Sequence, residues 1–190
     1  MENINLIEEE QYRKTLPFPY ISIDNILNHK FALDIQNEIL EMDKDLWDRY
    51  DNPFEEKYTL RDKNKLPKNT QDLFDILTSA DFIQKLSKIV GEKLYNDPTK
   101  HWWGVHKYKN GDKLDIHSDA GVHPISGDKK HVTLGIYLSL NWNENNKGHL
   151  EIWEGENVLK DDAKLIKKIT EFLPSFNKLI LFNNTNNAWH

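Results

Sequence analysis

Residues 131–140 read His131-Val-Thr-Leu-Gly-Ile-Tyr-Leu-Ser-Leu140 and give the clearest strand signal in this chain of 190 residues. Every second position from Val132 to Leu140 is apolar, whereas Thr133, Tyr137 and Ser139 carry hydroxyl groups at positions between. Successive side chains of a strand point to opposite faces of the sheet. The stretch therefore predicts a β-strand with one apolar face, which helices would cover, and one face that bears hydroxyls.

Short extended runs separated by turn signals continue on both sides of this strand. The runs at 103–108 and 113–117 flank Lys109-Asn-Gly-Asp112, and an Asn-Gly pair between extended runs predicts a β-hairpin. Residues 120–130 contain Gly121, Pro124 and Gly127 and predict a loop. Two further strands are predicted at 148–153 and 176–182, with a helix at 161–172 between them.

The N-terminal half of the chain predicts helices instead. A strand at 20–23 precedes Asp24, a residue type that caps helices, and apolar residues recur at helical spacing over 26–42. A second helical stripe covers 71–95. Residues 47–70 show no clear period, which predicts either an irregular connection or a mobile loop over a site.

Helices followed by a series of strands are typical of an α+β chain. We expect a mainly β core, built as a sandwich or jelly roll and buttressed by the N-terminal helices. A chain of 190 residues fits one domain with its own core. The prediction is therefore a single domain over 1–190, with a helical support region at about 1–100 and the β core at about 101–190.

Composition narrows the expected partners and chemistry. The net charge is −6 and lysines are interspersed with acids, so neither nucleic acid nor an anionic membrane is an expected partner. The N-terminus lacks the layout of a signal peptide, and no apolar run approaches the length of a membrane span, which predicts a cytoplasmic protein. The chain has no cysteine, so any metal must be held by nitrogen and oxygen atoms.

The motif His117-Ser-Asp119 places two types of metal ligand on the same face of an extended segment. Two histidines and one carboxylate on one face form the facial triad of non-haem Fe(II) oxygenases, which leaves coordination positions open. Spacing alone does not select this motif. Chance predicts about 1.3 histidine-x-acid pairs, from 8 histidines times 31 acids divided by 190, and the chain holds a second pair, His149-Leu-Glu151.

The surroundings favour His117 and Asp119 over the rival pair. The side chains that share their face are polar, which suits the wall of a wet cavity. His190 follows the strand-like run 178–182 and an Asn-rich turn, so the backbone can deliver a third ligand to a fixed place. His149 stands beside an apolar strand and is expected to be a surface or cross-strand residue.

Six short motifs follow one another through the second half of the chain. They are Tyr108-x-x-Gly-Asp112, His117-Ser-Asp119, Val132-Thr-Leu-Gly-Ile-Tyr-Leu138 with Asn141-Trp142, Gly148-His-Leu-Glu-Ile-Trp153, Leu173-Pro-x-x-Asn177-Lys-Leu-Ile-Leu-Phe182 and Trp189-His190. Their order and spacing resemble the Fe(II)/2-oxoglutarate-dependent oxygenases, most closely the branch that contains the prolyl hydroxylases.

This resemblance implies a double-stranded β-helix with His117, Asp119 and His190 as iron ligands. Tyr108, Thr133 and Tyr137 match positions that contact 2-oxoglutarate in the family, and their hydroxyls suit a carboxylate. The resemblance further implies Fe(II) as cofactor, 2-oxoglutarate as cosubstrate, and ascorbate as an auxiliary reductant. The implied activity is hydroxylation of a C–H bond, with a peptidyl proline as substrate or otherwise a small molecule such as a sugar or amino acid.

The sequence departs from the family pattern at one point. In the family, the strand after the second histidine carries an Arg or Lys that pairs with the far carboxylate of 2-oxoglutarate, whereas the sequence ends at His190. We therefore expect a core that lacks its last strand. Two alternatives remain: a non-enzymatic β-sandwich module that binds carbohydrate or metal, and a jelly-roll metalloenzyme that does not use 2-oxoglutarate.

Overall fold

The computed structural model describes residues 4, 7–119 and 121–190. The chain folds into two compact units, one formed by 1–29, 84–94 and 116–190 and the other by 30–83 and 95–115. Within the described residues, no helix is long and apolar enough to cross a membrane. The single domain expected over 1–190 remains a prediction.

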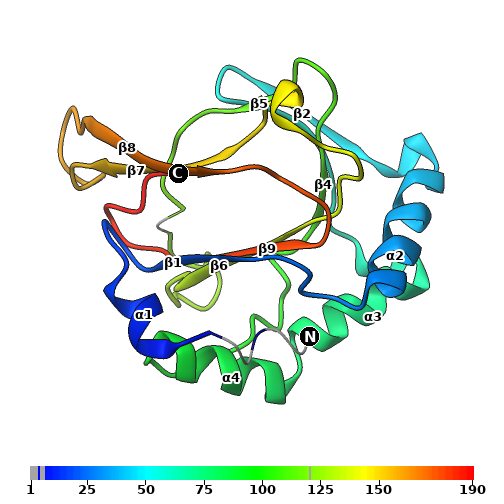
Figure 1. The fold of residues 1–190 in the computed structure, drawn as a ribbon, viewed down its shortest axis with the longest axis horizontal. Helices are drawn as coiled ribbons and strands as arrows, with labels where there is room; N and C mark the ends of the chain where they lie inside the picture. The colour runs from blue at the N-terminus through cyan, green and yellow to red at the C-terminus, as the bar shows by residue number, and fades with distance from the viewer. Residues whose placement is uncertain (1–3, 5–6, 120) are drawn as a thin grey trace. The chain divides into compact units, whose positions relative to one another are not determined.

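The first unit contains two antiparallel sheets (Figure 1). One has the strand order β1-β9-β6 and the other pairs β7 with β8. The bounds of the strands are β1 (Tyr20–Ile23), β6 (Val132–Tyr137), β7 (Leu150–Gly155), β8 (Leu165–Phe172) and β9 (Lys178–Asn183). The remaining elements are α1 (Glu9–Lys14), the 3-10 helix η4 (Glu144–Asn146) and the part of α4 (Ala80–Val90) from residue 84 onward.

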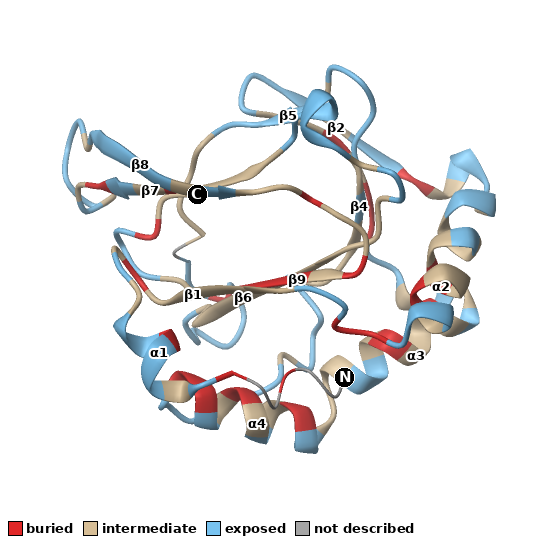
Figure 2. Cartoon of the chain, in the orientation of Figure 1, coloured by how far each residue is buried: buried red, intermediate tan, exposed pale blue. Residues whose placement is uncertain are grey.

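Strand β9 is the centre of the first unit because both of its faces are covered. Its four residues from Leu179 to Phe182 are all buried (Figure 2). On one face, Leu181 lies between Ile21 of β1 and Leu134 of β6. On the other face, Ile180 and Phe182 join a cluster that includes Phe18, Ile152 and Ala188. A strand buried on both faces fixes the register of its two neighbours.

The second unit packs short helices against a small antiparallel sheet in which β3 pairs with β2, β4 and β5. Its strands are β2 (Asp48–Asn52), β3 (Glu55–Leu60), β4 (Val105–Lys107) and β5 (Lys113–Leu114). Its helices are α2 (His29–Glu41) from residue 30 onward, α3 (Lys68–Leu77) and the 3-10 helices η2 (Lys44–Leu46) and η3 (Lys63–Lys65). Trp47, Leu60 and Leu66 form its buried core.

The expected strands at 20–23, within 131–140 and within 176–182 are confirmed as β1, β6 and β9. The helix expected at 161–172 is wrong, because residues 165–172 form β8 and pair with β7. Its apolar residues also recur at helical spacing, but pairing with β7 decides the outcome. The hairpin between 103–108 and 113–117 is wrong as well, since β4 and β5 both pair with β3 instead of with each other.

Two further predictions need correction in the N-terminal half. Residues 47–70, expected to be irregular, contain the β2–β3 pair, in which Asn52 Oδ1 accepts hydrogen bonds from the backbone of Phe54 and Glu55 at 3.0 Å. The helix expected over 71–95 is two helices, α3 and α4, because Thr78 and Ser79 interrupt it. The Ser79 hydroxyl accepts a hydrogen bond from the backbone of Phe82 at 3.3 Å, as a helix cap does.

Helix α2, expected from residue 26, begins at His29, and Asn177 binds the segment before it. Asn177 Oδ1 accepts a hydrogen bond from Leu27 N at 2.9 Å, and Asn177 Nδ2 donates to Leu27 O at 2.8 Å. The carbonyl of Asn177 also accepts from Ile26 N at 3.1 Å. Of these groups, a helix that began at residue 26 would need the Leu27 carbonyl as an acceptor, and Asn177 Nδ2 already occupies it.

We expect Asn177→Ala to lower the free energy of unfolding by about 2–4 kcal/mol, because both backbone groups of Leu27 would lose buried partners. Asn177 is fully buried and has a φ of 61°, which also disfavours alanine. Urea denaturation would measure the loss. Asn145→Ala is the control, because Asn145 is exposed. Equal stability of the two variants would contradict the structural role of Asn177.

Candidate metal centre

The backbones of His117 and His190 pair with each other, which brings together residues far apart in the sequence. His117 N donates to His190 O at 2.9 Å, and His190 N donates to His117 O at 2.9 Å. Residues that exchange both hydrogen bonds in an antiparallel pair carry their side chains on the same face. The two imidazole rings accordingly lie with their centroids 4.4 Å apart.

Trp189 anchors the segment that carries His190. Its carbonyl accepts a hydrogen bond from Trp153 N at 3.0 Å, and its indole Nε1 donates to Glu156 O at 2.7 Å. The indole passes directly over Gly155, where an added Cβ would lie closer than 3.0 Å to two indole atoms and 3.1 Å from a third. Gly155 is therefore required for this close approach. Because His190 follows Trp189 directly, the contacts of Trp189 also fix the position of His190.

The donor atoms of His117, Asp119 and His190 all lie within 4.8 Å of one another. His117 Nε2 is 3.4 Å from Asp119 Oδ1, and His190 Nε2 is 3.9 Å from Asp119 Oδ2. The structure thus brings together the three ligands that the sequence predicts. Two imidazole nitrogens and one carboxylate oxygen on one side of an ion are the donor set that Fe(II) takes in non-haem oxygenases, so these residues fit the metal.

His190 is held as a neutral imidazole with Nε2 available. Its Nδ1 lies 3.0 Å from Ala188 O, and since a carbonyl only accepts, Nδ1 must carry the proton. The side chain is only 6% exposed, and the ring of Phe182 lies 4.4 Å from it between centroids. Burial and the neighbouring His117 lower the pKa of His190 to about 4. A neutral imidazole whose other nitrogen is bonded to a carbonyl is the usual form of a metal-ligating histidine.

Asp119 is an ionised carboxylate within a network of donors. Its Oδ2 accepts a hydrogen bond from Thr133 Oγ1 at 2.7 Å and contacts the ammonium group of Lys130. Burial would raise the pKa of Asp119, but the hydrogen bond with His117 and the charge of Lys130 outweigh burial and hold that pKa far below its ordinary value. The carboxylate is therefore charged and oriented without a metal.

The predicted cosubstrate contacts have different positions. Thr133 and Tyr137 point to the same face of β6, and their cross-strand partners on β9 are Phe182 and Lys178. The Thr133 hydroxyl donates directly to Asp119. Tyr137 packs on the cluster around Phe182, and burial raises its pKa to about 12, so its phenol keeps its proton. Tyr108 belongs to the other compact unit, and its contact with 2-oxoglutarate remains a prediction.

Two neighbours of the centre were not predicted from the sequence. Lys130 lies in the loop before β6, where alternation along a strand gives no guide to its direction. Asn184 Nδ2 donates to Thr133 Oγ1 at 3.0 Å. Alternation could have identified Asn184, because it lies two positions after Phe182 and residues two positions apart on a strand share a face. The rival residue His149 lies 2.8 Å from Glu144 Oε2 through its Nε2 and is outside the donor cluster.

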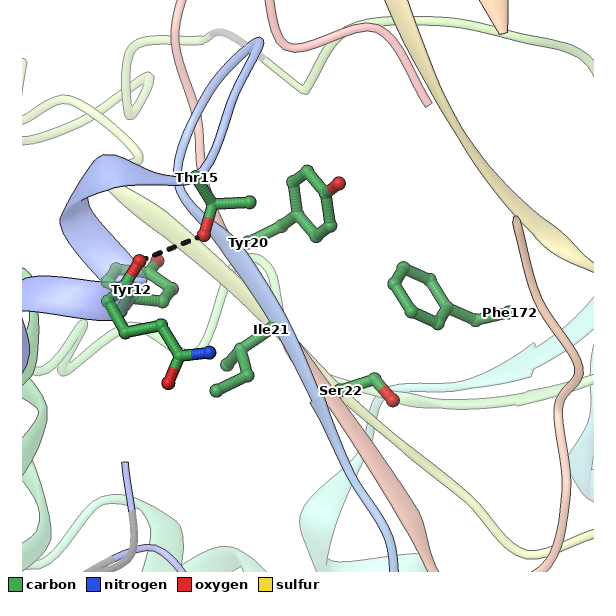
Figure 3. Close-up of a pocket in the computed structure, with 7 residues that line it drawn as sticks. Tyr12, Thr15, Tyr20, Ile21, Ser22 and Phe172 are labelled. Carbon is green, nitrogen blue, oxygen red and sulfur yellow. Dashed lines mark hydrogen bonds between the residues drawn. The ribbon is translucent and has the colours of Figure 1, made fainter. Parts of the chain in front are cut away.

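A separate hollow of about 230 Å³ lies between α1, β1 and the end of β8 (Figure 3). The rings of Tyr20 and Phe172 border it and meet edge to face, with centroids 5.9 Å apart. Tyr12 also lines it and donates through its hydroxyl to Asn183 Oδ1 at 2.7 Å. None of the predicted site residues lines this hollow.

Residues 103–190 match the family model of the 2OG-Fe(II) oxygenase superfamily. This region is a 2OG-Fe(II) oxygenase domain. The match begins before the motif of His117 and Asp119 and extends to His190, so it spans the whole donor set. No curated protein sequence matches the chain.

Two solved structures share the fold of this oxygenase. One is a prolyl hydroxylase from Trichoplax adhaerens in complex with a peptide fragment of the hypoxia inducible factor oxygen degradation domain, with a TM-score of 0.61 and 16% identity, covering 99% of this chain and 83% of that chain. The other is among the prolyl 4-hydroxylases of Phytophthora capsici, with a TM-score of 0.55 and 17% identity, covering 95% of this chain and 56% of that chain.

These similarities confirm the predicted fold class, a jelly-roll core supported by N-terminal helices. The oxygenase is a 2-oxoglutarate-dependent dioxygenase, and its family implies Fe(II) as cofactor and 2-oxoglutarate as cosubstrate. The alternatives of a non-enzymatic binding module and of a metalloenzyme without 2-oxoglutarate are therefore not retained.

We expect Gly155→Ala to weaken metal binding by about tenfold or more, because the methyl group displaces the indole of Trp189 and with it His190. Titration with Co²⁺ would measure the dissociation constant. Gly135→Ala is the control, since a Cβ at Gly135 meets no atom within 4 Å. Unchanged Co²⁺ binding by the Gly155 variant would show that Trp189 does not position His190.

Proposed function

We propose that this oxygenase hydroxylates a C–H bond of a peptidyl proline, with His117, Asp119 and His190 holding Fe(II). The observation that carries the proposal is the cluster of two imidazole nitrogens and a carboxylate oxygen within 4.8 Å, in a region that matches the family model. Iron and 2-oxoglutarate supply the oxidising chemistry. In the balanced reaction, one oxygen atom of O₂ enters the substrate and the other enters succinate, while 2-oxoglutarate loses CO₂.

The residues around the metal have separate proposed tasks. His190 is buried and neutral, and its bond to Ala188 O keeps its Nε2 directed to the metal. Tyr108 and Tyr137 are proposed to donate hydrogen bonds to 2-oxoglutarate, and Tyr137 keeps its proton at neutral pH because its pKa is about 12. Thr133 is proposed to orient Asp119, because its hydroxyl donates a hydrogen bond to Asp119 Oδ2.

Similarity of fold supports the choice of a peptidyl proline as substrate. Both solved structures are described as prolyl hydroxylases, and one of them holds a peptide. The peptidyl proline is therefore proposed by analogy of fold.

We expect succinate release when the protein is supplied with Fe(II), 2-oxoglutarate and O₂, and loss of at least about 100-fold in His117→Ala, because a two-ligand centre cannot hold the metal in place. His149→Ala is the matched control, because it removes an imidazole that contacts Glu144 outside the donor cluster. Wild-type protein that binds Fe(II) but releases no succinate, with or without peptide, would refute the proposed activity.

The substrate class has its own measurement. We expect mass spectrometry of proline-containing peptides after turnover to show the gain of one oxygen atom on proline, and no gain in peptides whose proline is replaced by alanine. Succinate release without any modified peptide would support the activity and contradict the peptidyl substrate.

A further inference from the structure

The two oxygens of the Asp119 carboxylate have different surroundings. Oδ1 faces the imidazole of His117, with Nε2 3.4 Å away. Oδ2 accepts the hydroxyl of Thr133 at 2.7 Å and contacts the ammonium group of Lys130. A carboxylate oxygen has two lone pairs in the carboxylate plane, so these two donors use the capacity of Oδ2. Oδ2 also lies 3.9 Å from His190 Nε2, but Oδ1 receives neither of these two hydrogen bonds and so keeps more acceptor capacity for a metal.

The direction of the hydrogen bonds shows that Thr133 orients Asp119. Asn184 Nδ2 donates to Thr133 Oγ1 at 3.0 Å, so the threonine oxygen is an acceptor in that bond. The single hydroxyl proton of Thr133 has two acceptors within reach, Asp119 Oδ2 at 2.7 Å and Asn184 Oδ1 at 3.2 Å. The charged and closer carboxylate oxygen is the stronger acceptor, so the proton goes to Asp119. Asn184 is held in turn by its backbone, since Asn184 N donates to His131 O at 2.8 Å. These hydrogen bonds from Asn184 and Thr133 orient the carboxylate plane without adding a charge to the site.

Lys130 differs from Thr133 because it brings a full positive charge to the same oxygen. Its side chain is 17% exposed and that of Asp119 is 23% exposed, so water screens the pair only in part. Without metal, the ammonium group neutralises the carboxylate. A divalent ion bound to Oδ1 must share this carboxylate with the ammonium group, and like charges a few ångströms apart in a partly buried site repel.

We propose that Thr133 and Lys130 act on the metal in opposite directions through the same oxygen of Asp119. Thr133, supported by Asn184, is a positioning residue that strengthens metal binding. Lys130 weakens metal binding and leaves the loaded centre with excess positive charge, which favours the binding of an anion. This inference rests on the proposed function only in that His117, Asp119 and His190 hold a divalent metal.

The consequence is a coupling between metal and anion. The ion contributes two positive charges, Asp119 one negative and Lys130 one positive, so the loaded centre carries a net charge of two. A dicarboxylate such as 2-oxoglutarate neutralises that charge, and each ligand then raises the affinity for the other by the same factor. Replacing Lys130 with a neutral residue must tighten metal binding and loosen 2-oxoglutarate binding together.

The test is titration of the full chain with Co²⁺ in the absence of 2-oxoglutarate, followed by titration of the Co²⁺-loaded protein with 2-oxoglutarate. Lys130→Gln keeps a donor for Oδ2 and removes the charge, so Co²⁺ should bind about 5- to 100-fold more tightly and 2-oxoglutarate more weakly. Lys130→Arg keeps the charge and should resemble wild type. Thr133→Val should weaken Co²⁺ binding by about 10- to 100-fold, and Thr133→Ser should restore it.

Lys129→Gln is the matched control, because it removes the same charge from the neighbouring exposed residue. Its Co²⁺ affinity should stay within about twofold of wild type. Equal affinities of the Lys129 and Lys130 variants, or weaker Co²⁺ binding by Lys130→Gln, would overturn the role of Lys130. Equal effects of Thr133→Val and Thr133→Ser would overturn the positioning role of the hydroxyl.

These outcomes are separable from failure of the proposed function. Loss of the Co²⁺ signal in His117→Ala assigns the signal to the centre, whether or not the protein turns over. Absence of Co²⁺ binding in wild type would refute the metal centre itself. Opposite shifts for the two residues in a protein that releases no succinate would support the inference and refute the activity.

Discussion

The centre depends on the two backbone hydrogen bonds that His117 and His190 exchange. In such a pairing, a slip of one residue turns every side chain to the opposite face. His190 would then leave the face of His117, and Trp189 would replace it there. The indole of Trp189 prevents this slip, because it fits over Gly155 and donates to the carbonyl of Glu156. The geometry of the ligands is thus a result of register, and an aromatic side chain on the far face maintains the register.

Two of the three candidate ligands, His190 and Asp119, have their metal-binding protonation states without an ion. His190 is kept neutral by burial, and its proton is directed to Ala188 O. Asp119 is kept ionised, because His117 and Lys130 stabilise its charge against the cost of burial. His190 and Asp119 therefore already have the protonation states in which they bind a metal. Preorganisation of this kind reduces the entropic and electrostatic cost of assembling the centre.

Alternation along strands was sufficient to predict β6 and the shared face of His117 and Asp119 from the sequence, and a strand-like apolar run predicted β9. Alternation failed where two periods coincide, as in β8, whose apolar residues also fit a helix and whose pairing with β7 decided the structure. It failed again for the hairpin signal around Asn110, because β3, hidden within an apparently irregular segment, pairs with both flanking strands. Lys130 was out of reach for another reason: it lies in a loop, and a loop does not transmit the alternation of the strand that follows.

The pairing of His117 with His190 also has a consequence for folding. The segment between them closes a long loop, so its entropic cost must be met before the donors meet, and contacts of such sequence separation slow folding. A metal ion finds only incomplete donor sets in the unfolded chain. A metal ion bound at the centre would therefore stabilise the folded structure by mass action. Metal occupancy of the centre would thus show that the whole first unit is folded.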